Sequence, residues 1–315
     1  MENPRLIASG LRFPEGPLVM ADGSLIFCEM LAGRLSQVRP PSTDVAVVAE
    51  LGGGANGAAL GPDGAIYVCN NGGYAFTDLG VMLLPTAEPY GRDQADDYSG
   101  GRIERVDPET GEVTVLYTEC DGNPLKSPND IVFDSTGHFW FTDHGHARPR
   151  EEDRGGLYYA AADGSSIVEA VFPLNRPNGV GLSPAGDRVY VAETMTGRLW
   201  AWGLDGPGNL VKAVPYGTGG TLVTGLPGLQ YFDSLGVEAD GNVCVATLLN
   251  GGITVCSPDG SRVEHVPSGG EFSDVLTTNI CWGGDDMQTA YITLSSSGRI
   301  IAVDWPRPGL RLAYP

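Results

Sequence analysis

The chain has 315 residues, of which 42% are hydrophobic, and 39 acidic against 19 basic residues give it a formal net charge of −20. The hydrophobic content suffices for a packed core and excludes a disordered chain, while the acidity argues against nucleic acid and anionic membranes as partners. No apolar run reaches the ~20 residues of a membrane span, and residues 1–5 lack the features of a signal peptide, so we expect a cytoplasmic protein.

A pattern of two short apolar strands joined by a tight turn occurs six times along the chain. The turns are Asp-Gly or similar, which is the strongest short-range signal for a β-hairpin. Each copy opens near a polar residue that we call its marker, and the six markers are Glu15, Asn56, Asn129, Asn178, Asp233 and Asn279. They lie 41, 73, 49, 55 and 46 residues apart. Apart from the interval of 73, these spacings match the ~40–50 residues of a four-stranded propeller blade.

Further strands follow the hairpins. A third strand begins after Gly33, Gly101, Gly197 and Gly298, each followed by arginine, and a fourth is visible over residues 45–49, 113–117 and 262–266. The sequence therefore predicts an all-β fold, a six-bladed β-propeller with four antiparallel strands per blade, as a single domain over residues 1–315. The fourth strand of the last blade comes either from residues 309–314 or from residues 1–10. Two β-sandwiches, the competing fold, do not explain a marker that recurs six times in phase.

The markers are expected to form a ring around one mouth of the central channel, because the innermost strand of each blade lines that channel. The ends of the second strands return to the same edge, and these residues are Glu29, Asn70, Asp143, Glu193, Thr247 and Thr293. Carboxylates and amide oxygens crowded around an axis repel one another unless a cation lies among them, and a hard divalent cation is the simplest solution. The alternative is that the markers only cap turns, which does not require a glutamate at position 15.

Four marker segments resemble motifs of the SMP-30/gluconolactonase family: Phe13-Pro-Glu15-Gly-Pro, Pro128-Asn129-Asp130, Arg176-Pro-Asn178-Gly179 and Phe232-Asp233-Ser-Leu-Gly236. This family of six-bladed propellers includes bacterial lactonases and, more distantly, diisopropyl fluorophosphatase. Its members bind one divalent metal in the central channel. The resemblance implies that Glu15, Asn178 and Asp233 are metal ligands and that Asn129 binds the metal, the substrate or both. Sugar-lactone members place an arginine just before this asparagine, where the present chain has Lys126-Ser127-Pro128; the difference argues against gluconolactone itself as substrate.

The resemblance and the ring together predict a metal-dependent hydrolase that opens a lactone. One divalent cation, Ca²⁺ in the first place and Mg²⁺, Mn²⁺, Zn²⁺ or Fe²⁺ as alternatives, would act as a Lewis acid on the lactone carbonyl. Its expected ligands are Glu15, Asn129, Asn178 and Asp233. Asp233 is the expected catalytic residue that activates the attacking water, with Asp143, His144, His146 and Glu193 as alternative bases. Substrate contacts are expected from Asn71, Asn129, Asp143, His144 and Glu193.

Other functions stay open at this point. One is a phosphotriesterase or fluorophosphatase-like hydrolase in which Asp233 is the nucleophile. A second is a binding propeller without catalysis, and a third is a metal-free propeller enzyme of the strictosidine-synthase type. The long interval carries an insertion over residues 73–100, which either forms a lid over the pocket or makes an oligomer contact. The sequence does not indicate the oligomeric state.

Overall fold

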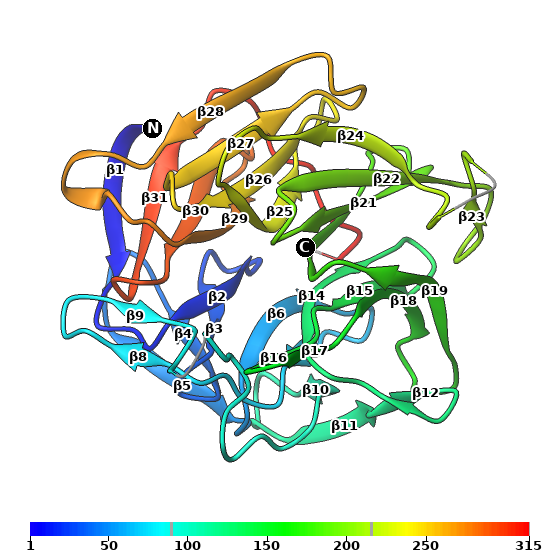
Figure 1. Ribbon diagram of the computed structural model, residues 1–315. Coiled ribbons are helices and arrows are strands. Elements are labelled where there is room, and N and C mark those ends of the chain that lie inside the picture. The colour runs from blue at the N-terminus through cyan, green and yellow to red at the C-terminus, as the bar shows by residue number, and fades with distance from the viewer. Residues whose placement is uncertain (89–90, 215–216, 315) are drawn as a thin grey trace.

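The computed structural model describes residues 1–88, 91–214 and 217–314, and its regular secondary structure is almost entirely β-strand (Figure 1). Six sheets surround a central axis, which confirms the predicted six-bladed propeller. The only helical element in this described part is the short 3-10 turn η1 (Gly270–Phe272). None of its helices is therefore long enough to cross a membrane.

The first three blades follow one another along the chain from the innermost to the outermost strand. The first contains β2 (Pro14–Val19), β3 (Leu25–Glu29), β4 (Arg34–Val38) and β5 (Val45–Glu50). The second contains β6 (Ala55–Leu60), β7 (Ile66–Asn70), β10 (Arg102–Val106) and β11 (Val113–Tyr117). The third contains β14 (Pro128–Phe133), β15 (His138–Asp143), β18 (Gly155–Ala161) and β19 (Ile167–Leu174).

The other three blades complete the circle. The fourth contains β20 (Pro177–Leu182), β21 (Arg188–Glu193), β22 (Arg198–Leu204), and β23 (Leu210–Val211) and β24 (Thr221–Gly225), which both pair with β22. The fifth contains β25 (Tyr231–Val237), β26 (Val243–Leu248), β27 (Gly252–Cys256) and β28 (Val263–Pro267). The sixth contains β29 (Thr277–Gly283), β30 (Thr289–Leu294), β31 (Arg299–Asp304) and β1 (Glu2–Ala8).

Three short hairpins lie outside the blades: β8 (Thr77–Asp78) with β9 (Leu83–Leu84), β12 (Glu119–Cys120) with β13 (Asn123–Pro124), and β16 (Ala147–Arg148) with β17 (Glu151–Glu152). Only the first belongs to the insertion.

The N-terminal strand β1 closes the ring by pairing antiparallel with β31 (Figure 1). Of the two sequence-based options for the fourth strand of the last blade, residues 1–10 are therefore the correct one. Residues 309–314 instead cross the end of the channel opposite the markers. There the Leu310 N–H donates to the Val237 carbonyl at 2.8 Å, and the Tyr314 ring lies 5.7 Å from that of Phe133.

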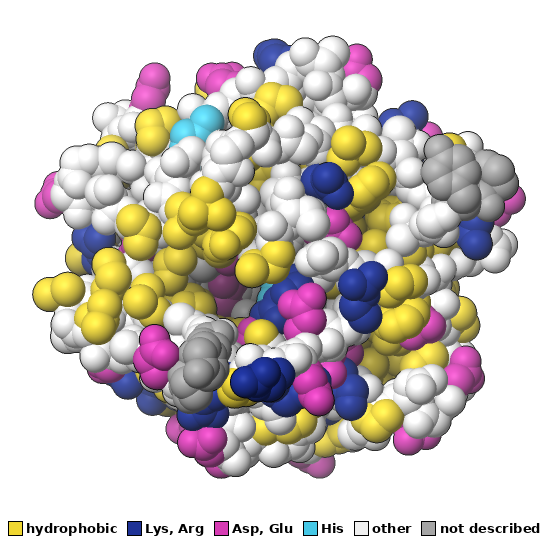
Figure 2. Space-filling view, in the orientation of Figure 1, with side chains coloured by type: hydrophobic (Ala, Val, Ile, Leu, Met, Phe, Trp, Pro, Cys, Tyr) yellow, Lys and Arg dark blue, Asp and Glu magenta, His cyan; other side chains and the backbone are white. Residues whose placement is uncertain are grey.

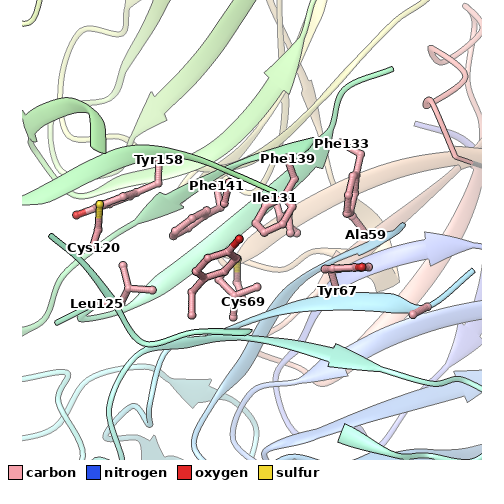
Figure 3. Packing of buried hydrophobic residues seen from close by; sticks show 14 residues of the cluster. Ala59, Tyr67, Cys69, Cys120, Leu125, Ile131, Phe133, Phe139, Phe141 and Tyr158 are labelled. Atoms are coloured by element: carbon pink, nitrogen blue, oxygen red, sulfur yellow. The ribbon is translucent and has the colours of Figure 1, made fainter. Parts of the chain in front are cut away.

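Packing between neighbouring blades forms the core. The second strands β3 and β7 are buried along their whole length, because each lies between two other blades, whereas the outer strands β5 and β11 expose residues to solvent. Between the second and third blades, aromatic rings from both blades pack against one another (Figure 3). The Tyr67 and Phe133 rings lie 4.9 Å apart at 78°, an edge-to-face contact. Such contacts fix the distance between blades.

Each marker lies at an irregularity of its innermost strand. In all six blades the register between the first and second strands shifts by one residue beside the marker, just after it in the first blade and just before it in the sixth. An extra residue of this kind is a β-bulge, which bends a strand and redirects its side chains. The bulge explains why a polar residue occurs at this place six times in strands that are otherwise apolar.

Glycines after the markers allow the innermost strands to approach closely. A Cβ atom on Gly179 would lie 2.5 Å from the Leu235 backbone nitrogen of the next blade, and one on Gly57 would lie 2.4 Å from the Asn129 carbonyl oxygen. We therefore expect Gly179→Ala to lower the free energy of unfolding by about 1–3 kcal/mol, as measured by urea denaturation. Gly269→Ala is the control, because a Cβ there meets nothing within 4 Å. Equal stability of the two variants would contradict this account.

A cavity of about 700 Å³ occupies the channel on the other side of the markers. Its inner end reaches Asp130 and Asn279, and residues 310–314 line its outer end. This far cavity is walled mainly by apolar side chains from the innermost strands.

Candidate metal centre and active site

The six markers surround one mouth of the channel, which we call the marker mouth. All six are buried and stand near the start of the innermost strands β2, β6, β14, β20, β25 and β29. The ring is continuous across the closure of the propeller, where the Asn279 amide donates to Glu15 Oε2 at 3.5 Å. Figure 2 shows the molecule hollowed near the centre of this face, with acidic and basic side chains in the hollow.

Glu15 and Asp233 place two acidic groups in the buried ring. Burial raises the pKa of the Glu15 carboxyl well above its usual range, and the nearby charge of Asp233 raises it further. Burial also raises the pKa of Asp233 to about 7, although hydrogen bonding with Asn178 and with the Ser234 N–H opposes the shift. Both carboxyls resist ionisation in this environment. A cation between them would remove that resistance.

The two amides of the predicted ligand set offer oxygen atoms to the same region. Asn178 donates through Nδ2 to the Thr194 hydroxyl at 3.2 Å, and its Oδ1 accepts from the Ser234 hydroxyl at 3.3 Å. Asn129 Oδ1 is buried and accepts no hydrogen bond. A buried acceptor without a donor costs free energy, and a cation would satisfy it. The ligand set therefore consists of oxygen atoms alone and fits a hard divalent cation. Its members are Glu15, Asn129, Asn178 and Asp233.

The residue types at the ring favour oxygen coordination. Within the described ranges, no three His, Cys, Asp or Glu side chains are grouped so that they could hold a metal. Two carboxylates and two amide oxygens are hard ligands, and hard ligands suit Ca²⁺, Mg²⁺ or Mn²⁺ better than soft sulfur ligands do. Asn279 supports the ring in another way, since its Oδ1 accepts from the Ile280 N–H at 2.8 Å and its amide donates to Glu15.

The residue after Asn129 is a third buried acid. Asp130 accepts the Ile131 N–H at 3.0 Å and the Val180 N–H at 3.1 Å, and so links the innermost strands of the third and fourth blades. Burial raises the pKa of Asp130 to about 7. These bonds give Asp130 a structural role beneath the ring.

Two predicted substrate-contacting residues are occupied by local structure. Asp143 accepts the backbone N–H groups of Lys126 and Ser127 at 2.7 Å each. Glu193 accepts from the Asn175 N–H at 2.8 Å, the Thr196 hydroxyl at 2.7 Å and the Trp200 indole at 3.0 Å. Each carboxylate thus anchors the segment that precedes the marker of its own blade. The contacts give both carboxylates a structural role, and we do not include them in the proposed active site.

The other two predicted contact residues lie deeper in the marker mouth. His144 is buried, and its Nδ1 lies 3.0 Å from the Tyr74 hydroxyl. Burial and the positive charge of Arg176 lower the pKa of His144 to about 3. Its side chain is therefore neutral at neutral pH, and so low a pKa makes it a weak base, whereas the sequence offered it as an alternative base. Asn71 accepts the Gly73 N–H through Oδ1 at 3.0 Å, but its Nδ2 is buried without a partner.

A cluster that the sequence did not reveal lies beside them. Asp93 of the insertion forms a buried ion pair with Arg176, and its Oδ1 lies 3.0 Å from His146 Nδ1. His146 Nε2 lies 2.9 Å from the Asn71 carbonyl oxygen, so both ring nitrogens face acceptors. Burial alone would raise the pKa of Asp93, yet the hydrogen bond from His146 and the charge of Arg176 hold it below its usual value.

The insertion passes over the marker mouth. It leaves the second blade after β7, and its Phe76 ring packs 5.1 Å from that of Phe13 in the first blade. The Leu83 N–H donates to the Ser296 carbonyl of the sixth blade at 2.7 Å, and Asp93 reaches the third and fourth blades. Residues 89–90 of the predicted 73–100 segment lie outside the described residues. The remainder contacts blades on both sides of the channel.

Comparison with known proteins gives consistent matches. A family model described as the SMP-30/Gluconolactonase/LRE-like region matches residues 13–296. A gluconolactonase of Zymomonas mobilis is 26% identical over 322 residues, which cover 92% of this chain and 78% of that protein. Lactonase drp35 of Staphylococcus haemolyticus is 27% identical over 255 residues, covering 80% and 68%. The structure of a calcium-binding protein, regucalcin, from Agrobacterium tumefaciens shares the fold with a TM-score of 0.66 at 19% identity, covering 96% and 95%.

Proposed function

The chain belongs to the SMP-30/gluconolactonase/LRE-like family, and we propose on this basis that it is a metal-dependent lactonase, which opens a lactone ring by hydrolysis. The observation that carries the proposal is the ring at the marker mouth. Two buried carboxyls with raised pKa values, Glu15 and Asp233, stand there with a buried acceptor of Asn129 that has no donor. A gluconolactonase and a lactonase among the relatives support the same reaction class.

Glu15, Asn129, Asn178 and Asp233 are the residues that would hold the metal. A divalent cation bound there supplies a Lewis acid that polarises the lactone carbonyl. Oxygen ligands favour Ca²⁺, and the name of the calcium-binding structural relative supports that choice. Mg²⁺, Mn²⁺, Zn²⁺ and Fe²⁺ are the alternatives to be tested.

Asp233 is the proposed general base. A carboxylate at the metal site stays ionised and can still accept the proton of an attacking water, which is the task of a general base. Its carboxylate would take a proton from the water that attacks the carbonyl carbon. When the ring C–O bond breaks, the same proton passes to the leaving alkoxide oxygen. The product is a hydroxy acid, and Asp233 is ready for the next cycle.

His144 is proposed as a neutral hydrogen-bonding group. Its pKa of about 3 excludes an imidazolium at neutral pH, and its Nδ1 is held by Tyr74. It can therefore orient a substrate oxygen without adding charge to the site. This role replaces that of an alternative base.

The direct test is a panel of aliphatic, aromatic and sugar-derived lactones. Apoprotein is reconstituted separately with each of the five metals, and hydrolysis is followed by the fall in pH. The proposal expects turnover of at least one lactone class with one metal and its loss on chelation. A diisopropyl fluorophosphate assay in parallel covers the phosphoester alternative. Activity on that ester alone, or no turnover of any lactone, would overturn the proposal.

We further propose that the insertion over residues 73–100 is a lid for this pocket. Replacing residues 75–98 by a short Gly-Ser linker should change the ratio of kcat/KM values between apolar and sugar lactones by ~10-fold or more, because a lid shapes the pocket and excludes water. The ratio is measured with the metal-loaded enzyme.

A control variant separates a lid from an oligomer contact. Leu79 and Val81 at the hairpin tip are 55% and 83% exposed, so L79S/V81S removes apolar surface without removing the covering segment. A contact between subunits predicts that this variant changes the size measured by gel filtration. If the deletion changes only that size and leaves the kcat/KM ratio intact, the lid interpretation is wrong.

A further inference from the structure

Unsatisfied polar atoms gather at the marker mouth. Five buried side-chain nitrogen or oxygen atoms of the described chain have no hydrogen-bond partner, and four of them belong to Asn71, Asn129 and Arg176. The fifth, the indole nitrogen of Trp282, borders the far cavity. Since buried polar groups are nearly always paired in native proteins, such a group of exceptions marks a place where a ligand completes the bonding.

The four atoms divide into two kinds. Asn129 Oδ1 is an acceptor and suits the cation of the proposed metal site. Arg176 Nε, Arg176 Nη1 and Asn71 Nδ2 are donors, and a cation cannot satisfy them. They require oxygen atoms that the described protein does not supply, so a second chemical group is expected beside the metal.

Arg176 is held in place by groups that leave these donors free. Its side chain is only 8% exposed. Nη2 pairs with Asp93, which is itself fixed by the Ala147 N–H at 2.8 Å and by His146 at 3.0 Å. Asp93 therefore compensates the charge of the guanidinium and positions it, while Nε and Nη1 keep unused N–H bonds. Buried donors of a charged group are costly when unpaired.

The guanidinium lies at the same mouth as the proposed metal ligands. Arg176 precedes Asn178 by two residues, at the entry to β20. The charges of both Arg176 and Asp233 act on Tyr74. The hydroxyl of Tyr74 lies 3.0 Å from His144 Nδ1 and 3.4 Å from the Ser127 hydroxyl, two residues before Asn129. Tyr74 thus stands between the arginine and the ring.

We propose that Arg176 is the anchor of a subsite for a carboxylate on the substrate, so that the lactone hydrolysed at the ring carries a carboxylate substituent. This inference rests on the proposed lactonase function for the reacting end of the molecule. A carboxylate offers charge-assisted hydrogen-bond acceptors to Nε–H and Nη1–H, and these bonds are stronger than those to a neutral sugar hydroxyl.

Binding of a pair of stable analogues tests the subsite without turnover. 5-Oxopyrrolidine-2-carboxylate is the lactam counterpart of a carboxylated γ-lactone, and its carboxamide is the neutral match. Calorimetry with the Ca²⁺-loaded full chain should show the acid binding ~10-fold or more tightly than the amide, as expected for a buried charge-assisted contact. In Arg176→Met this preference should fall to about 2-fold or less.

Two further variants guard against a folding artefact. Arg198→Met removes an exposed arginine of the same blade and should keep the wild-type preference. Arg176→Lys retains the charge but not the planar donors, and an intermediate preference is expected, with circular dichroism confirming the fold of each variant. Equal binding of acid and amide by the wild type, or no binding of either, would overturn the subsite.

The same ligand pair with a lactone ring separates this inference from the proposed function. The wild type should favour 5-oxotetrahydrofuran-2-carboxylate over its amide in kcat/KM, and Arg176→Met should lose that preference. If the lactams are discriminated but no lactone is hydrolysed, the subsite stands and the lactonase proposal fails. If lactones are hydrolysed without discrimination by charge, the lactonase stands and the subsite fails.

Discussion

Replacing Asp233 by Asn is expected to lower kcat by ~10³-fold, even when the metal site is kept full, because general-base catalysis contributes about 10²–10⁴-fold. The amide keeps the size of the side chain and an oxygen for the metal, but it cannot take up the proton of the attacking water. Turnover is measured with the best lactone from the panel, at metal concentrations shown by calorimetry to saturate the variant.

Glu15→Gln is the matched control for this experiment. It removes the other buried carboxylate of the ring and therefore weakens metal binding by a similar loss of charge. If Glu15 only holds the metal, saturating metal restores more activity to this variant than to Asp233→Asn. Near-wild-type turnover by metal-loaded Asp233→Asn would show that Asp233 is not the base. A single turnover in ¹⁸O-water distinguishes the remaining alternative, since label in the Asp233 carboxylate instead of the product identifies it as a nucleophile.

The fold and the ring could be predicted from the sequence because both follow from local patterns. Six hairpin signals at blade spacing specify the propeller, and the same edge of each hairpin must carry its marker. The structure adds the reason for the marker's position, a bulge in every innermost strand. The choice of β1 as the closing strand depended on pairing across the whole chain, which local patterns do not contain.

The contacts around the ring could not be predicted in the same way. Asp143 and Glu193 have the residue type and position of active-site groups. Their oxygens, however, accept hydrogen bonds from backbone N–H groups that lie two or three residues before the markers. Asp93 and Arg176 are 83 residues apart in the chain. Their pairing depends on the path of the insertion across the mouth, and the periodicity of the blades says nothing about an insertion. The arginine before Asn178 was visible, but its unused donors were not.

Removal of the metal should make the stability of the protein fall as the pH rises from 5 to 8. In the metal-free fold, burial raises the pKa of Asp233 from 3.8 to about 7 and that of Glu15 in the same direction. Between the ordinary and the raised pKa, the folded state binds protons that the unfolded state has released. Stability is therefore present at low pH and is lost as the pH rises through this window, by up to ~1.4 kcal/mol per pH unit for each such group.

A bound divalent cation removes this dependence, because it keeps both carboxylates ionised in the folded state. The stabilisation by Ca²⁺, taken as the difference between urea midpoints with Ca²⁺ and with chelator, should thus be larger at pH 8 than at pH 5. The surface carboxyls titrate alike with and without metal, so their contribution to the pH dependence cancels in this difference. Asp130 is also buried with a raised pKa. It is not one of the proposed metal ligands, so its contribution is the same with and without metal. Asp233→Asn removes one titrating group and should flatten the metal-free curve of stability against pH. Parallel curves for the metal-loaded and metal-free wild type would exclude Glu15 and Asp233 as the metal site.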